Sequence, residues 1–282
     1  MSHTLPIALS PKKNYNEGIL KKIEIGDTME AYGSFAQVYD LFMEDTPYEQ
    51  WGKHIEKIWK RYDMTPKLIA ELGCGTGTLS NYFAKKNIDV IGIDNSEQML
   101  GVAKDKAMAQ GLDVLYLCQD MRDFELYGTV DSIYSACDSI NYILEDEELL
   151  QTFKWVNNYL EPGGIFVFDI NTQYKYEEIL GENTFAYNME EASYIWENYY
   201  EKEEQINEYL VTFFVKEEDD RYSKFEELHH ERMYTLQTIT KLLEQAGMGV
   251  EGAFDGYTFN SIRPDSDRIT IIAREQGKER IK

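Results

Sequence analysis

The segment Glu71-Leu72-Gly73-Cys74-Gly75-Thr76-Gly77 constrains the fold more than any other part of the chain. It follows an apolar, strand-like run at 67–72 and precedes a helix-like run at 79–85. Glycines at alternate positions let the backbone turn tightly and approach a ligand that a Cβ atom would exclude. The segment therefore predicts a ligand-binding turn between a buried strand and a helix of an α/β protein.

A carboxylate follows one helix and one strand later. The apolar run Val90-Ile91-Gly92-Ile93 ends in Asp94. An acidic residue at the tip of the second strand can accept hydrogen bonds from both ribose hydroxyls of an adenosine-type cofactor. The glycine turn, the strand and this carboxylate together indicate a nucleoside site on a parallel sheet.

The spacing of the glycines separates two classes of nucleoside cofactor. The dinucleotide-binding pattern Gly-x-Gly-x-x-Gly requires a small residue three positions after Gly75, where the helix packs on the strand. Thr78 occupies that position, and the third glycine, Gly77, comes one position earlier. The spacing therefore disfavours a nicotinamide-dependent oxidoreductase.

With these residues the chain resembles the class I S-adenosylmethionine-dependent methyltransferases, whose first motif is an acidic residue followed by Gly-x-Gly-x-Gly. Further segments resemble that family in the same order. Residues 94–100 are similar to its ribose and adenine segment, and Gln119-Asp120-Met121 to its adenine-edge segment. Residues 136–142 are similar to the segment after the fourth strand, and residues 160–164 to the turn into the fifth. The resemblance covers residues 30–172 and 235–275.

The resemblance implies the fold, the cofactor and a set of cofactor contacts. The fold is α/β, a doubly wound, Rossmann-like, seven-stranded methyltransferase sheet, and the cofactor is S-adenosyl-L-methionine. No metal is expected. The implied cofactor-binding residues are Tyr32, Tyr39, Trp51, Gly73, Cys74, Gly75, Gly77, Asp94, Asn95, Met99, Asp120, Met121, Cys137 and Tyr142.

Apolar, β-branched runs separated by helix-like segments predict a parallel sheet. These runs lie at 67–72, 89–94, 113–118, 130–136 and 164–170. A helical stripe at 236–246 precedes two further strands near 249–255 and 268–273, which we expect to form the family's terminal antiparallel hairpin.

Residues 171–235 depart from a minimal methyltransferase. Aromatic and charged residues alternate in strand-like fashion at 194–200, 206–216 and 222–234, which predicts an inserted antiparallel sheet. An insert leaving the fifth strand emerges at the carboxyl edge of the sheet, where α/β enzymes bind ligands. We therefore expect it to cover the acceptor site, with an oligomerisation surface as the alternative.

These patterns divide the chain into four parts. They are a flexible N-terminal extension at 1–28, a cofactor-binding methyltransferase core at 29–170, the insert at 171–235 and the C-terminal completion of the core sheet at 236–282.

The charge balance restricts the partners. The chain carries 28 Lys and Arg against 51 Asp and Glu, a net charge of −23, and residues 171–235 alone carry −11. Nucleic-acid affinity rests mainly on cationic neutralisation of phosphates, so no nucleic-acid partner is expected. The insert's charge favours neutral or cationic acceptors, although most of the acidic surface is typical of a protein that is simply kept in solution.

The cysteines and the apolar runs bear on the compartment. Cys74, Cys118 and Cys137 lack CxxC spacing and are odd in number, so neither a disulfide framework nor a zinc site is expected. Each lies at or near a strand end, where we expect it to pack as a small hydrophobe. No apolar run approaches the length of a membrane span. We expect a cytoplasmic protein without membrane contact, and a homodimer is left open.

Methyl transfer from a sulfonium needs positioning more than covalent catalysis, because the cofactor supplies the reactive methyl group. A base is required only when the acceptor arrives protonated. Asp138, Asn141 and Tyr142 are placed to orient the acceptor or the methionine moiety, but no residue is assigned as catalytic. His229 and His230 are the weaker candidates for a base, and His54 is expected on a surface-like helix.

Residues 32–40 read Tyr-x-x-Phe-Ala-x-x-Tyr-Asp, and we call them the aromatic entry segment. This segment and the strand insert after the fifth strand are similar to bacterial small-molecule methyltransferases, including sugar N-methyltransferases. The leading hypothesis is therefore an enzyme that methylates N or O of a small soluble acceptor. The alternatives are a methyltransferase that acts on a protein or tRNA, and a non-catalytic S-adenosylmethionine-binding module.

Overall fold

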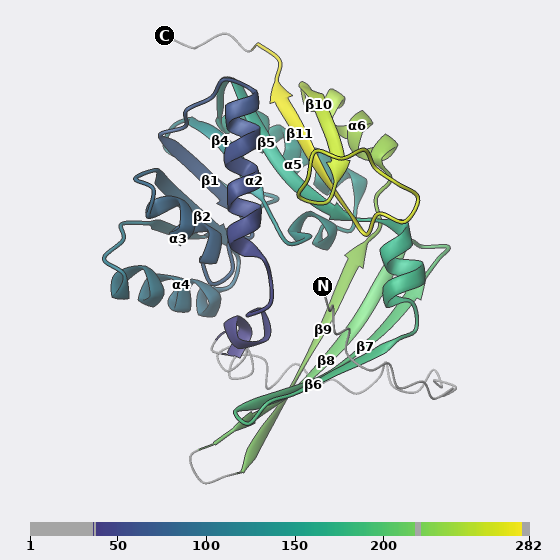
Figure 1. The fold of residues 1–282 in the computed structure, drawn as a ribbon. Helices are drawn as coiled ribbons and strands as arrows, with labels where there is room; N and C mark the ends of the chain where they lie inside the picture. The colour runs from purple at the N-terminus through teal and green to yellow at the C-terminus, as the bar shows by residue number, and fades with distance from the viewer. Residues whose placement is uncertain (1–35, 37, 218–220, 278–282) are drawn as a thin grey trace.

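The computed structural model describes residue 36 and residues 38–217 and 221–277. The expected extension at 1–28 and the predicted contact Tyr32 lie outside these residues. Two sheets make up the described part: a seven-stranded sheet flanked by helices, and a four-stranded sheet that extends from beneath it (Figure 1).

The larger sheet has the strand order β10-β11-β5-β4-β1-β2-β3, which confirms the expected seven-stranded methyltransferase fold. Its strands are β1 (Leu68–Leu72), β2 (Asp89–Asp94), β3 (Leu115–Cys118), β4 (Val130–Ser135), β5 (Leu160–Asn171), β10 (Met248–Asp255) and β11 (Arg268–Glu275). The first five run parallel, and β11 is antiparallel to both β5 and β10. The strand order reverses between β1 and β4, so ligands are expected at the carboxyl ends of these two neighbours.

Helices cover both faces of this sheet (Figure 1). Helices α2 (Tyr48–Arg61), α3 (Thr78–Ala84) and α4 (Glu97–Ala109) pack on one face, and α5 (Asp146–Tyr159) and α6 (Leu236–Gln245) on the other. Strand side chains alternate between the two: Ile69 packs with the α2 and α3 cluster, whereas Ala70 and Leu72 pack with the α5 and α6 cluster. This alternation is what a sheet buried on both sides requires.

The insert forms the smaller sheet, in which all neighbouring strands are antiparallel. Its strands are β6 (Thr184–Asn188), β7 (Ala192–Glu201), β8 (Ile206–Lys216) and β9 (Tyr222–Arg232). A short π-helix, η3 (Lys175–Leu180), links β5 to it. The sequence patterns missed η3 and β6, because β6 is a short edge strand whose side chains are largely exposed and carry no apolar alternation.

A buried carboxyl group on β1 links this strand to its neighbours. Glu71 is 3% exposed, and its Oε2 accepts hydrogen bonds from the Ser80 hydroxyl on α3 and from the Tyr134 hydroxyl on β4, the latter at 2.9 Å. Burial raises the pKa of Glu71 to about 7, against the opposing effect of these two donors. Glu71 is therefore partly protonated at neutral pH.

We predict that Glu71→Gln flattens the pH dependence of stability. The ordinary pKa of this carboxyl is 4.5 and the folded pKa is about 7, so the unfolded chain releases the proton first as the pH rises between these values. The contribution of Glu71 to the free energy of unfolding is therefore fully present below pH 4.5. It falls between pH 4.5 and pH 7, by about 1.4 kcal/mol for each unit of difference between the two pKa values. The glutamine keeps an oxygen that accepts both hydrogen bonds but cannot ionise. Urea unfolding at pH 5 and pH 8 measures the effect, and an equal pH dependence in variant and wild type would contradict it.

Candidate active site

The glycine turn after β1 lies at the carboxyl edge of the sheet. Gly73, Gly75 and Gly77 all have left-handed backbone angles, with φ of +69°, +51° and +72°. A Cβ atom on Gly73 would lie 2.6 Å from the Ser139 hydroxyl, and one on Gly77 would lie 2.2 Å from the Tyr116 hydroxyl. A Cβ on Gly75 would meet nothing within 4 Å, so the space beside this residue is open to a ligand.

Asp94, at the end of β2, faces this turn. Its Oδ2 accepts a hydrogen bond from the Gly75 amide at 2.8 Å, and its Oδ1 accepts one from the Ser96 amide at 2.9 Å. Ser96 caps α4 by accepting from the Met99 amide at 3.2 Å. Burial raises the pKa of Asp94 and the backbone donors oppose this rise. The carboxylate thus lies where a ribose would reach it from the glycine turn.

The turn after β4, residues 136–142, borders the candidate site on a second side, next to the glycine turn. We call it the strand-4 turn. Cys137 and Asp138 have left-handed φ values of +61° and +54°, which non-glycine residues rarely adopt. The Arg268 guanidinium donates to Asp138 Oδ1 at 2.6 Å and also pairs with Asp169, whose Oδ2 accepts from the Asp138 amide at 3.0 Å. Although burial opposes it, Arg268 with Lys175 lowers the pKa of Asp138 to about 2.

Aromatic side chains border the candidate site on a third side. Tyr39 and Tyr48 share a side-chain hydrogen bond, and burial raises the pKa of both phenols, so both are neutral. Trp51 stacks on Tyr257 with ring centroids 4.6 Å apart and planes 12° apart, and Arg268 lies 5.7 Å from the Trp51 ring centroid. Arg268 therefore links Trp51 of α2 to Asp138 of the strand-4 turn.

Asp40, Thr76 and Lys106 fasten the entry segment to the glycine turn, and we call them the Asp40 clasp. The Lys106 ammonium contacts Asp40 at 2.5 Å and the Thr76 hydroxyl at 3.2 Å, and the Thr76 hydroxyl donates to Asp40 at 2.5 Å. Lys106 also contacts the Thr78 hydroxyl at 3.0 Å. The sequence patterns did not single out Lys106, which lies inside α4 without a motif around it.

The described part of the predicted cofactor set gathers at this edge. Met121 has its Cε 3.4 Å from the position of a Cβ on Gly73, so it lies beside the glycine turn. Asp120 instead directs its carboxylate to the Arg122 guanidinium, at 2.6 Å, which lowers its pKa. Asn95 follows Asp94 directly, and its carbonyl accepts a contact from the Cys118 thiol at 3.6 Å. Binding of the cofactor by these residues stays a prediction.

The insert contributes a polar group that the sequence patterns missed. Glu231, near the end of β9, is 2% exposed. Burial and the neighbouring Asp138 raise its pKa to about 8. The signal available in the sequence was the alternation Glu227, His229, Glu231, which places three polar side chains on one face of a strand.

Two expectations about single residues are wrong. His54 is 4% exposed rather than on a surface, because the loop after β10 covers its helix face and places Phe259 4.6 Å from the imidazole. Burial lowers the pKa of His54 to about 4, so it is neutral at physiological pH. Cys118 is exposed, since it ends the edge strand β3, whereas Cys74 is buried as expected.

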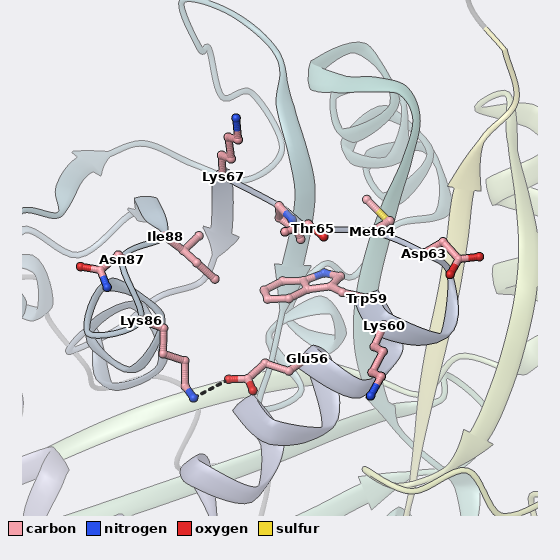
Figure 2. A pocket seen from close by; sticks show the side chains of 11 residues that line it. Glu56, Trp59, Lys60, Asp63, Met64, Thr65, Lys67, Lys86, Asn87 and Ile88 are labelled. Atoms are coloured by element: carbon pink, nitrogen blue, oxygen red, sulfur yellow. Dashed lines mark ion pairs between the residues drawn. The ribbon is translucent and has the colours of Figure 1, made fainter.

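A cavity of about 680 Å³ lies at the opposite edge of the sheet. Figure 2 shows it between α2 and the loops that enter β1 and β2, with Lys86 and Glu56 paired at 2.9 Å on its rim. Lys67 and Ile88 line it and precede these strands, so the cavity is at the amino edge and plays no part in the site described above.

Comparisons with known proteins show which family the sequence and the fold resemble. A methyltransferase-domain family model matches residues 69–164. A methyltransferase of Geobacillus sp. (strain WCH70) is 35% identical over 245 residues, which is 86% of this chain and 99% of that protein. The crystal structure of an S-adenosylmethionine-dependent methyltransferase from Clostridium acetobutylicum ATCC 824 is similar with a TM-score of 0.80 and 33% identity, covering 87% of this chain and 99% of that one.

A third similarity covers about half of the chain. The dTDP-3-amino-3,4,6-trideoxy-alpha-D-glucopyranose N,N-dimethyltransferase of Streptomyces venezuelae is 31% identical over 140 residues, 48% of this chain and 56% of that protein. The chain belongs to the S-adenosylmethionine-dependent methyltransferases, and its cofactor is S-adenosylmethionine. The open space at Gly75 and the carboxylate of Asp94 fit the adenosine part of this cofactor.

The described residues contain neither a metal-binding cluster nor a membrane-spanning helix. Among residue 36 and residues 38–217 and 221–277, no group of three or more His, Cys, Asp or Glu side chains is arranged to hold a metal ion. None of the helices within those residues has the length and apolar character needed to span a membrane.

We predict that Asp94→Ala weakens binding of S-adenosylhomocysteine. Loss of a charge-assisted hydrogen bond costs about 1.5–3 kcal/mol, which corresponds to roughly tenfold to a hundredfold in Kd. Asp94→Asn retains one side-chain oxygen that can accept from a backbone amide of the turn, but it has lost the negative charge. Comparison of Asp94→Asn with Asp94→Ala therefore separates the loss of hydrogen bonds that hold the turn from the loss of the contact with the ribose.

Calorimetric titration measures these affinities, and circular dichroism checks the folding of each variant. Asp89→Asn is the matched control, because Asp89 is exposed at the other end of the same strand. An unchanged Kd in Asp94→Ala would show that Asp94 does not contact the cofactor.

Proposed function

We propose that this methyltransferase transfers the methyl group of S-adenosylmethionine to N or O of a small soluble acceptor. The observation that carries the proposal is the convergence of the strand-4 turn with the end of β9. The Asn141 amide donates to the Arg232 carbonyl at 2.7 Å, and the Asn171 backbone amide donates to Asn141 Oδ1 at 3.0 Å. This end of the insert is thereby held beside the expected position of the methyl donor.

The chain's own residues have to orient the acceptor and exclude water. When bound, the cofactor supplies an electrophilic methyl group, and alignment of the acceptor lone pair with the carbon–sulfur bond provides much of the rate enhancement. Neutral phenols such as Tyr39 and Tyr48 can orient a small polar acceptor by hydrogen bonds. Residues 171–235 act in this proposal as the cover of the acceptor site.

Charge supports a small acceptor over a nucleic acid. A chain with net charge −23, of which −11 lies in residues 171–235, repels phosphate backbones. The Streptomyces venezuelae relative is named for methylation of an amino sugar, which is a small acceptor.

We also infer a cytoplasmic location from the unpaired cysteines. A homodimer is a further proposal, which sedimentation of the purified protein would test.

Ligand-dependent melting tests the cofactor part of this proposal. S-adenosylmethionine or S-adenosylhomocysteine at a hundredfold excess over Kd should raise the free energy of unfolding by about 2.7 kcal/mol. NAD and NADP at the same concentrations should leave the melting temperature unchanged. The proposal would be wrong if NAD or NADP stabilised the protein and S-adenosylmethionine did not.

Turnover tests the acceptor part. Formation of S-adenosylhomocysteine is measured with a panel of small amines and alcohols, with bulk tRNA and with unfolded protein as separate arms. We expect turnover in the small-molecule arm. Turnover confined to tRNA or protein would reject the small acceptor, and cofactor binding without turnover in any arm would favour a non-catalytic binding module.

A further inference from the structure

Glu231 receives three hydrogen bonds inside the protein. Its Oε2 accepts from the Tyr176 hydroxyl at 2.8 Å and from the Asn171 side-chain amide at 3.2 Å, and its Oε1 accepts from the Tyr209 hydroxyl at 3.2 Å. Three donors from three different elements aim at one buried carboxyl group. Such an arrangement holds the group in one position and permits it to ionise when a cation approaches.

A second carboxyl group shares a hydrogen bond with Glu231. This partner is Asp138 of the strand-4 turn, which Arg268 keeps ionised. Two adjacent carboxyl groups do not both ionise readily, so a proton stays on Glu231 at neutral pH. The titratable and charged side chains that act on Glu231 are Cys137, Asp138 and Tyr142 from the strand-4 turn, Lys175 and Tyr176 from η3, and Tyr209 from β8.

A chain of hydrogen bonds leads from Glu231 toward the surface of the insert. The Tyr209 hydroxyl contacts the Tyr142 hydroxyl, which lies 3.2 Å from His229 Nδ1. His229 stacks on Tyr209 with ring centroids 4.8 Å apart, and its Nε2 lies 3.1 Å from Glu227 Oε2. Tyr142 is 42% exposed, so the chain reaches solvent midway.

The same groups lie beside the cofactor turn. Ser139, next to Asp138, approaches Gly73 so closely that a Cβ there would clash with its hydroxyl. Glu231 is therefore connected to the glycine turn through Asp138 and Ser139.

We propose that Glu231 is the residue that takes a proton from the methyl acceptor, and that this acceptor is a small primary or secondary amine arriving as its ammonium ion. The proposal rests on the proposed function of this site. It makes the Tyr209, Tyr142 and His229 chain the route by which the proton leaves.

The steps balance in atoms and charge. When the ammonium binds, the proton held by Glu231 first leaves through the Tyr209, Tyr142 and His229 chain to solvent, which leaves a carboxylate. The ammonium then loses one proton to this carboxylate, and the electrons of the broken N–H bond remain on nitrogen as a lone pair. This lone pair forms the N–C bond to the methyl group while the C–S bond breaks with its electrons going to sulfur. The products are a methylated ammonium, neutral sulfide and protonated Glu231. Once ionised, the Glu231 carboxylate among neutral phenols favours a cationic acceptor over an alcohol.

The test uses sinefungin, a cofactor analogue that carries a primary amine where S-adenosylmethionine carries the methyl sulfonium. The ammonium of sinefungin lies where the transferred methyl group and the acceptor nitrogen would meet. The test therefore does not require that the natural acceptor is known. S-adenosylhomocysteine lacks the amine and serves as the reference ligand. At pH 8 we expect wild-type protein to bind sinefungin about tenfold more tightly than S-adenosylhomocysteine, as a buried charge-assisted pair provides.

Glu231→Gln should abolish this preference and leave the Kd of S-adenosylhomocysteine within about threefold of wild type, since the amide has no charge to pair with the ammonium. Glu226→Gln is the matched control, because Glu226 lies on the same strand and contacts Lys224 on the solvent side. A preference that persists in Glu231→Gln would overturn the proposal. Failure of wild-type protein to bind S-adenosylhomocysteine would instead reject the proposed function itself.

Proton release provides a readout that a structural role would not produce. At pH 7 an ammonium displaces the proton held by Glu231, so wild-type protein should release about one proton on binding sinefungin. Calorimetry in two buffers with different ionisation enthalpies measures this number. This measurement needs only wild-type protein, so it tests the proposal even if Glu231→Gln does not fold. If wild-type protein releases no proton on binding sinefungin, the proposal is wrong.

Discussion

The arrangement of the site depends on the ion pairs made by the guanidinium of Arg268, whose side chain is largely buried. Arg268 begins β11 and pairs with Asp169 on β5 and with Asp138 after β4, so it joins the ends of three strands. Buried ion pairs repay their desolvation only when the geometry is good and the remaining polar groups are satisfied. Here Asp169 also accepts from the Tyr257 hydroxyl at 2.7 Å and from the Asp138 amide. These bonds stabilise the left-handed backbone of the strand-4 turn.

The ion pair also determines which carboxyl group holds a proton. Because Arg268 keeps Asp138 ionised, the proton between the two carboxyl groups stays on Glu231. Glu231 comes from the insert and Asp138 from the core, so the electrostatics of the core extend into the insert. The insert is accordingly a functional part of the site in our proposal, and its end is tied to the strand-4 turn by Asn141.

The opposite side of the site is held by different means. The Asp40 clasp connects the aromatic entry segment to the glycine turn and to α4 through one ammonium group. Its side chains are partly exposed, so the ion pair itself contributes little to stability, and its main effect is to position Tyr39 and Thr76 relative to each other. Methyl transfer depends on such positioning, because the protein supplies alignment rather than a covalent intermediate.

Local patterns were sufficient to predict the cofactor class, the parallel strands and the terminal hairpin. A glycine turn, the carboxylate that follows on the next strand and the alternation of strand residues are encoded over a few neighbouring positions, so a sequence reports them directly. The same patterns predicted strands in residues 171–235, while the edge strand β6 and the π-helix η3 lacked such a period.

The polar centre of the site depended on long-range folding. Asp138 and Arg268 are 130 positions apart, Asn171 and Glu231 are 60 apart, and no local motif marks any of these pairs. The same holds for His54, whose burial results from a loop about 200 positions later in the chain. The physical reason is that pKa values and ion pairs depend on burial and on neighbours from other elements, which the packed structure alone brings together.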